Sequence, residues 1–142
     1  MATAIEGAKS LVYSPPSEDK GLVIRVALGC SHNACTFCGM YRHVQFCVRP
    51  LEEVVALIDQ AKDEKPNLRR AFLADGNALA APTNYLIKVM DHLYRTFPVL
   101  ETVACAARAS DILEKGPEQM AALRAAGLKL IYLGVESGDD MV

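Results

Sequence analysis

The chain has 142 residues, of which 51% are hydrophobic and 23% are charged, so we expect one ordinary domain with a buried core rather than a disordered chain. Its 15 basic residues are scattered among 17 acidic ones, which argues against a nucleic-acid binder. Residues 1–10 lack the apolar centre of a secretory signal, and no apolar run is long enough to span a bilayer. We therefore expect a soluble, cytoplasmic protein.

In chain order, residues 1–20 carry two prolines followed by polar residues, which predicts an N-terminal arm ahead of a core over residues 21–142. A strand-like apolar run fills residues 22–28, and Gly29 ends it. Apolar residues at helical spacing then alternate with short apolar runs bounded by proline or glycine. The expected helices are 51–65, 83–97 and 118–126, and the expected later strands are 71–74, 102–107 and 128–135.

This alternation predicts an α/β fold with a parallel sheet of about four βα units, the front part of a barrel. The polar candidates all follow the carboxyl ends of strands, the edge that holds the active site in parallel α/β proteins. No helix follows the fourth strand, so we expect a remaining barrel half or a partner chain to cover it. The strand-end candidates are the cysteine loop at 30–38, residues 75–77, residues 108–111 and Glu136.

The most informative stretch is the C-x4-C-x2-C run of Cys30, Cys35 and Cys38. Thiolates are soft ligands that select zinc, copper(I) or iron–sulfur clusters, and a cytosolic cysteine cluster is more often metal-binding than a disulfide framework. A four-iron cluster normally takes four cysteines, so three would leave one iron open. An open metal position is where a substrate or cofactor binds.

From about Leu22 to its end, the chain resembles the radical S-adenosylmethionine (radical SAM) superfamily. More narrowly, it resembles the subgroup of oxygen-independent coproporphyrinogen oxidases, methylthiotransferases and the Elongator catalytic subunit. The usual motif is C-x3-C-x2-C; the first gap here is one residue longer, while the aromatic Phe37 before the last cysteine is kept. The resemblance implies that Cys30, Cys35 and Cys38 hold a [4Fe–4S] cluster whose fourth iron is chelated by SAM. An electron from a flavodoxin or ferredoxin would then cleave SAM to a 5′-deoxyadenosyl radical that abstracts hydrogen from a substrate.

The resemblance also implies the contacts with SAM. Phe37 would lie against the adenine, and residues 75–77 would receive the methionine amine through backbone carbonyls, although only the middle glycine of the family's Gly-Gly-Glu is kept. Arg108 and Ser110 match the region that reaches the SAM carboxylate or ribose, and Glu136 would lie near SAM. The implied cofactor-binding residues are Phe37, Asp75, Gly76, Asn77, Arg108, Ser110 and Glu136.

An alternative of another class is a non-catalytic metal-binding module. It would be either a zinc site completed by His32, His43 or Cys47, or an iron–sulfur relay for electron transfer. Cys105 lies inside a strand pattern and is expected to be a small buried hydrophobe. Cys47 is expected to be a free thiol on the loop entering the first helix. The sequence does not identify the substrate, because in this family the substrate is recognised largely by later strands and appended domains.

Overall fold

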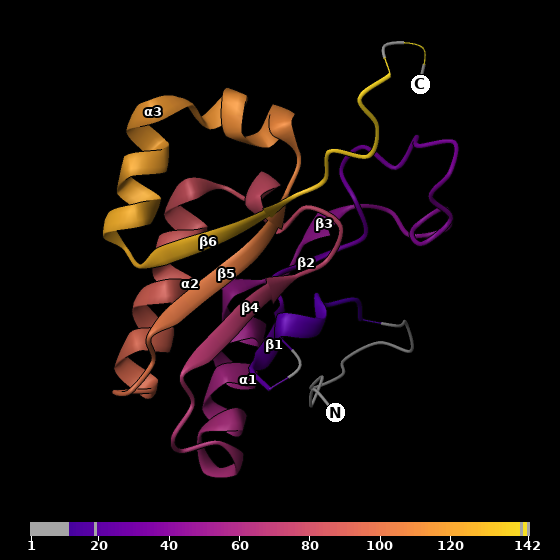
Figure 1. The fold of residues 1–142 in the computed structure, drawn as a ribbon. Helices are drawn as coiled ribbons and strands as arrows, with labels where there is room; N and C mark the ends of the chain where they lie inside the picture. The colour runs from indigo at the N-terminus through magenta and orange to yellow at the C-terminus, as the bar shows by residue number, and fades with distance from the viewer. Residues whose placement is uncertain (1–11, 19, 140, 142) are drawn as a thin grey trace.

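The structure, a computed structural model, describes residues 12–18, 20–139 and 141. Within these residues the strands are arranged as a four-stranded sheet and a separate two-stranded ribbon (Figure 1). The elements in order are η1 Pro16–Glu18, β1 Leu22–Arg25, β2 Ala27–Leu28, β3 Cys47–Val48, α1 Leu51–Glu64, β4 Arg70–Ala74, η2 Ala78–Ala80, α2 Thr83–Thr96, β5 Thr102–Ala107, α3 Ala109–Ala125 and β6 Leu128–Leu133.

The main sheet has the strand order β1-β4-β5-β6, and every neighbouring pair is parallel. Val23 pairs with Phe72, and Phe72 pairs with Ala104. The carboxyl ends of the strands therefore meet at one edge, as parallel pairing requires. This confirms the expected α/β fold with a parallel sheet, and the arrangement is consistent with part of a βα barrel.

The three helices cover one face of the sheet (Figure 1). Side chains alternate along each strand, so Ile24 and Leu73 pack among the helices, whereas Val23 and Phe72 belong to a separate cluster on the second face. Tyr132 packs against that second cluster. The strands are apolar on both faces because both faces carry contacts, as is typical of parallel sheets.

The apolar run at residues 22–28 is not one strand. β1 ends at Arg25, the chain bends at Val26, and β2 pairs antiparallel with β3 rather than joining the main sheet. The Arg49 backbone N–H donates to the Val26 carbonyl at 3.0 Å and ties the ribbon to the end of β1. Apolar periodicity alone cannot say which backbone a strand residue pairs with, so the ribbon was missed.

The third helix begins earlier than predicted. Gly116 takes a φ of +67° and breaks the helical geometry, and Pro117 opens the second segment as expected. The first segment, from Ala109 to the break, was not predicted because a Gly-Pro pair normally ends a helix. β6 also ends two residues before the predicted limit, at Leu133.

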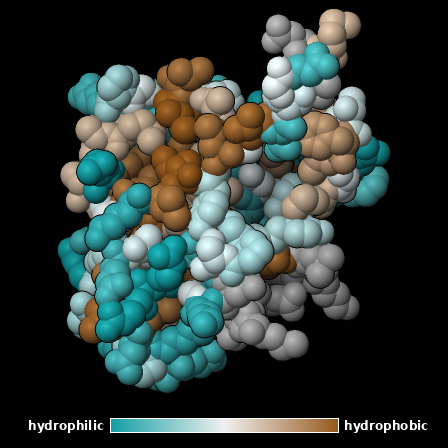
Figure 2. Space-filling model, viewed as in Figure 1, coloured by the Kyte–Doolittle hydropathy of each residue, from teal (hydrophilic) through white to brown (hydrophobic). Residues whose placement is uncertain are grey.

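β6 is an edge strand of the main sheet. Figure 2 shows apolar surface over α3 and β6, where Leu113, Leu130 and Leu133 are exposed. The coverage of this edge by further barrel strands or by a partner chain stays a prediction.

None of the helices in the described part of the chain combines the length and the apolar character that a membrane span requires. Residues 1–11 and 19 of the expected N-terminal arm lie outside the described residues. The arm's described part is residues 12–18 and 20, and within it η1 contacts β4.

Candidate functional site

A cavity of about 930 Å³ lies where the second face of the sheet meets the strand-end loops; we call it the strand-end cavity. Its size falls in the range of roughly 300–1,000 Å³ that small-molecule sites occupy. Phe72 and Tyr132 contribute from the second face, and the cysteine loop, the loop after β4 and the start of α3 contribute from the edge. The sequence candidates that line it are Cys30, Cys35, Phe37, Cys38, Asp75, Gly76, Arg108, Ser110 and Glu136.

Cys30, Cys35 and Cys38 are half-buried free thiols that line this cavity. Among residues 12–18, 20–139 and 141, no three His, Cys, Asp or Glu side chains stand close enough together to form a metal site. Three soft donors on one loop beside one cavity nevertheless form a donor set that fits an iron–sulfur cluster with an open iron. The loop would have to draw the thiols together as the cluster loads, since metal binding and local ordering are coupled.

The cysteine loop packs directly on the loop after β4. The Gly76 N–H donates to the Gly29 carbonyl at 3.0 Å. A Cβ at position 76 would stand 2.4 Å from the Cβ of Cys30, closer than real side chains approach. Residue 76 is therefore a glycine because the two loops touch there, and this contact sets the position of the first cysteine.

The Asp75 carboxylate forms its hydrogen bonds with side chains inside the protein. Its side chain is fully buried, and Oδ2 accepts hydrogen bonds from Arg25 Nε at 3.0 Å and Nη2 at 2.8 Å. The Tyr41 hydroxyl donates to Oδ1 at 3.4 Å. Burial raises the pKa of Asp75 above its ordinary value, although Arg25 opposes the shift. Burial also raises the pKa of Tyr41, with Asp75 adding to the rise, so the phenol stays protonated and can donate.

Asp75 also has a φ of +86°, a left-handed conformation that costs free energy for a residue other than glycine. Because its side chain is wholly enclosed, what the residue offers to the strand-end cavity is its backbone. The ion pair with Arg25 holds that backbone in place at the end of β4.

Asn77 does not line the cavity; its side chain is fully buried beneath it. Its Oδ1 accepts the Ser31 backbone N–H at 2.9 Å, and its Nδ2 donates to Ser31 Oγ at 2.6 Å. Nδ2 also donates to both carboxylate oxygens of Asp111, at 3.0 and 3.1 Å. Asp111 in turn accepts the Arg108 backbone N–H at 2.8 Å. Asn77 thus ties the cysteine loop to the first turn of α3.

Two further candidates bring polar groups to the cavity. Ser110 Oγ is buried and has no hydrogen-bond partner among the described residues, so a ligand group could satisfy it. Glu136 is exposed, has a φ of +62°, and turns its carboxylate back over Gly134. These groups and the Arg108 guanidinium are the donor and acceptor types that a zwitterionic ligand needs.

Several aromatic residues of the cavity were missed by the sequence reading. Tyr13 and Tyr41 make an edge contact with ring centroids 6.4 Å apart, and Phe72 and Tyr132 make another at 5.8 Å. Because successive side chains of a strand point to opposite faces, the sequence could have placed Phe72 and Leu73 on different faces of the sheet. Only the fold shows which of the two faces meets the cavity.

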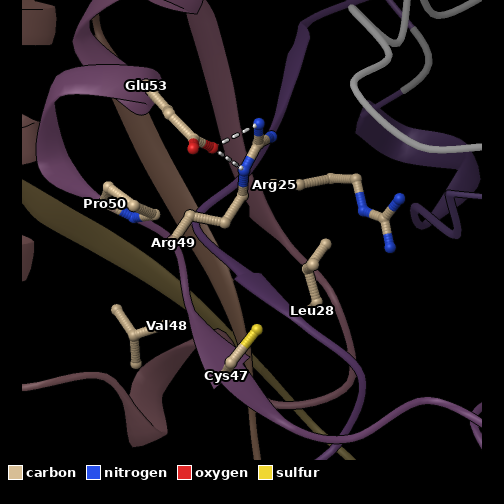
Figure 3. A pocket seen from close by; sticks show the side chains of 7 residues that line it. All are labelled: Arg25, Leu28, Cys47, Val48, Arg49, Pro50 and Glu53. Carbon is tan, nitrogen blue, oxygen red and sulfur yellow. Dashed lines mark hydrogen bonds and ion pairs between the residues drawn. The ribbon is translucent and has the colours of Figure 1, made fainter.

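The remaining candidates divide between this cavity and other places. His32 lines the strand-end cavity, whereas neither His43 nor Cys47 does. Cys47 lies on β3 opposite Leu28 and lines a separate, smaller cavity beside Arg49 (Figure 3). Cys105 is a buried core residue, as predicted, and burial raises the pKa of its thiol to about 12.

One comparison with known proteins agrees with this geometry. A comparison with curated proteins found no match. The family model described as the radical SAM superfamily matches residues 24–142, which is most of the chain. Members of that superfamily bind a [4Fe–4S] cluster and S-adenosylmethionine. The match begins within β1 and covers the cysteine loop and every strand end described above, and the chain therefore belongs to the radical SAM superfamily.

Proposed function

We propose that the chain is an enzyme that holds a [4Fe–4S] cluster through Cys30, Cys35 and Cys38 and binds SAM in the strand-end cavity. It cleaves SAM reductively to abstract hydrogen from a substrate. One observation supports this most directly: the three cysteines line the same cavity as the residues after β4, β5 and β6. Those loops are distant in sequence, and a shared cavity is what a cluster-bound cofactor would need.

The cluster and SAM, when bound, supply the one-electron chemistry, and the chain supplies orientation and electrostatics. Phe37 offers an exposed ring to the adenine. The backbone carbonyls of Asp75 and Gly76 accept hydrogen bonds from the methionine amine, because the Asp75 side chain is engaged elsewhere. The expected contact from Asn77 is not retained, since Asn77 does not line the cavity and its carbonyl accepts the Ala80 N–H at 2.9 Å. Arg108 and the unpartnered Ser110 hydroxyl donate to the SAM carboxylate or ribose, and Glu136 accepts from the ligand at the rim.

The finer assignments are part of the same proposal. The electron donor is a flavodoxin or ferredoxin, and the nearest functional subgroup is that of the coproporphyrinogen oxidases, methylthiotransferases and Elongator subunit. Residues 1–20 form an arm and residues 21–142 the radical SAM core. The protein works in the cytoplasm, where thiols stay reduced and available to iron.

The test is to reconstitute the full chain with iron and sulfide under nitrogen, reduce it, and record EPR spectra with and without SAM. We expect a [4Fe–4S]⁺ signal that changes when SAM is added, and loss of the cluster in Cys30→Ala, Cys35→Ala and Cys38→Ala. Cys47→Ala is the matched control, because its thiol is free but lies outside the cavity. A signal indifferent to SAM, or tightly bound zinc in place of iron, would favour the non-catalytic alternative.

A further inference from the structure

The segment at residues 12–18, which we call the strap, lies against the second face of the sheet, on the side away from the three helices (Figure 1). Val12 packs on the apolar cluster of that face. Tyr13, Ser14 and Pro15 line the strand-end cavity, and the strap ends in η1, which contacts β4. A segment that precedes the core in sequence thus supplies one side of the proposed cofactor site.

A buried carboxylate holds the strap in place. The Glu18 side chain is fully buried and pairs with Arg70 Nη2 at 2.6 Å. The Tyr132 hydroxyl donates to the same carboxylate oxygen at 2.7 Å and lies 2.6 Å from Ser17 Oγ. The hydrogen bond from Arg70 to Glu18 raises the pKa of Arg70.

We call the Glu18–Arg70–Tyr132 cluster the latch. Arg70 begins β4 and Tyr132 lies on β6, so the latch reaches across β5. The Glu18 carboxylate at its centre is fully buried, although the Arg70 side chain is 37% exposed, and this distinguishes the latch from an ordinary surface pair. The neighbouring ion pair, Arg69 with Glu101, is exposed on both sides, and such pairs contribute little to stability. A buried carboxylate whose partners are removed by substitution is left as an uncompensated charge. Opening the strap would return Glu18 to water and separate it from both of its partners, so the latch favours the strap's closed position.

The latch and the cavity share the side chain of Tyr132. Tyr132 belongs to the latch through its hydroxyl and to the cavity wall through its ring, which contacts Phe72 edge-on. At the other end of the strap, Tyr13 contacts Tyr41, which follows the cysteine loop in the sequence. Movement of the strap would therefore open the cavity at the Tyr13–Tyr41 contact and release the Tyr132 hydroxyl from Glu18.

We propose that the strap is a wall of the SAM cavity and that the latch holds this wall closed, which makes Glu18 a positioning residue for SAM binding. The proposal rests on the proposed function for its ligand. The strap excludes water from one side of the cavity by covering it with Tyr13 and Pro15, and a dry site protects reactive chemistry from solvent.

The first test compares Glu18→Gln with Glu101→Gln, a matched control at the exposed pair. The measurements on the reconstituted chain are iron content and the dissociation constant for SAM. We expect Glu18→Gln to load iron like the wild type and to bind SAM about tenfold more weakly, the effect of losing one charge-assisted hydrogen bond. Glu101→Gln should leave both values unchanged.

The second test reads the strap directly and needs no ligand. The chain has no tryptophan, so Tyr13→Trp introduces a single fluorophore into the strap. Val99→Trp is the control, since Val99 is 42% exposed, Tyr13 is 43% exposed, and Val99 does not line the cavity. Adding Glu18→Gln should raise the acrylamide quenching constant about twofold for Tyr13→Trp and leave it unchanged for Val99→Trp.

The two tests distinguish failure of the proposed function from failure of the strap proposal. If the wild type loads a cluster but does not bind SAM, the proposed function fails, while the quenching experiment still decides whether the latch holds the strap. If Glu18→Gln does not fold, Tyr132→Phe replaces it, because it removes only the hydroxyl of the latch and keeps the ring. Unchanged quenching and unchanged SAM affinity in a folded latch variant would overturn the proposal.

Discussion

Exchanging the polar groups of Asn77 and Asp111 offers a sharp test of how the cysteine loop is held. Asn77 donates to Asp111 through Nδ2 in the buried interior, and it accepts the Ser31 N–H through Oδ1 at a part-buried position. Asn77→Ala removes these bonds, and Asn77→Asp replaces the donor with a second carboxylate at almost the same place. The double variant Asn77→Asp/Asp111→Asn restores one donor and one carboxylate in exchanged positions.

The expected changes in the free energy of unfolding follow from the burial of Asn77 and from its distance to Asp111. Asn77→Ala leaves Ser31 without its partner while Asp111 keeps the Arg108 N–H, so we expect a loss of about 2 kcal/mol in the free energy of unfolding. Two carboxylates about 3 Å apart repel by roughly 5 kcal/mol at an effective dielectric constant of 20, and protonation of one reduces the penalty. Asn77→Asp should therefore be less stable than Asn77→Ala near neutral pH.

The assay is urea unfolding of the full chain, with the free energy taken from the midpoint and slope, together with iron content after reconstitution. The exchanged double variant should recover most of the stability that Asn77→Asp loses, and iron loading should follow the same order, because Ser31 lies in the cysteine loop. If Asn77→Asp were as stable as wild type, or if the exchange gave no recovery, the buried tie between loop and helix would be refuted.

Two further predictions concern the same loop and the remaining cysteines. Gly76→Ala should lower both stability and iron loading because its Cβ would collide with Cys30, whereas Gly39→Ala, which meets nothing within 4 Å, should change neither; equal behaviour of the two would contradict the close contact. In alkylation at about pH 8, mapped by mass spectrometry, the exposed Cys47 should react quickly. Cys105 should stay unmodified until the protein unfolds, since its pKa of about 12 keeps the thiol protonated, and rapid labelling of Cys105 in folded protein would show that it is not enclosed.

Local patterns in the sequence determined much of the fold. The alternation of apolar strands and amphipathic helices predicted the parallel sheet, and β5 begins and ends as expected. Parallel pairing brings strand ends to one edge, so the meeting of Cys30, Gly76 and Arg108 at one cavity followed from topology alone. Cys105 was recognisable as buried because its neighbours on both sides form an uninterrupted apolar run.

Only the tertiary structure decided what each strand-end side chain does. Asp75 and Asn77 are polar residues next to the cavity, yet their side chains are bonded inside the protein, to Arg25 and to Ser31 and Asp111. The partners in the latch are equally remote: Glu18 stands 52 residues before Arg70 and 114 before Tyr132. A residue's type limits the bonds it can make, but whether a carboxylate meets a ligand, an arginine or water depends on which distant segments the fold brings beside it.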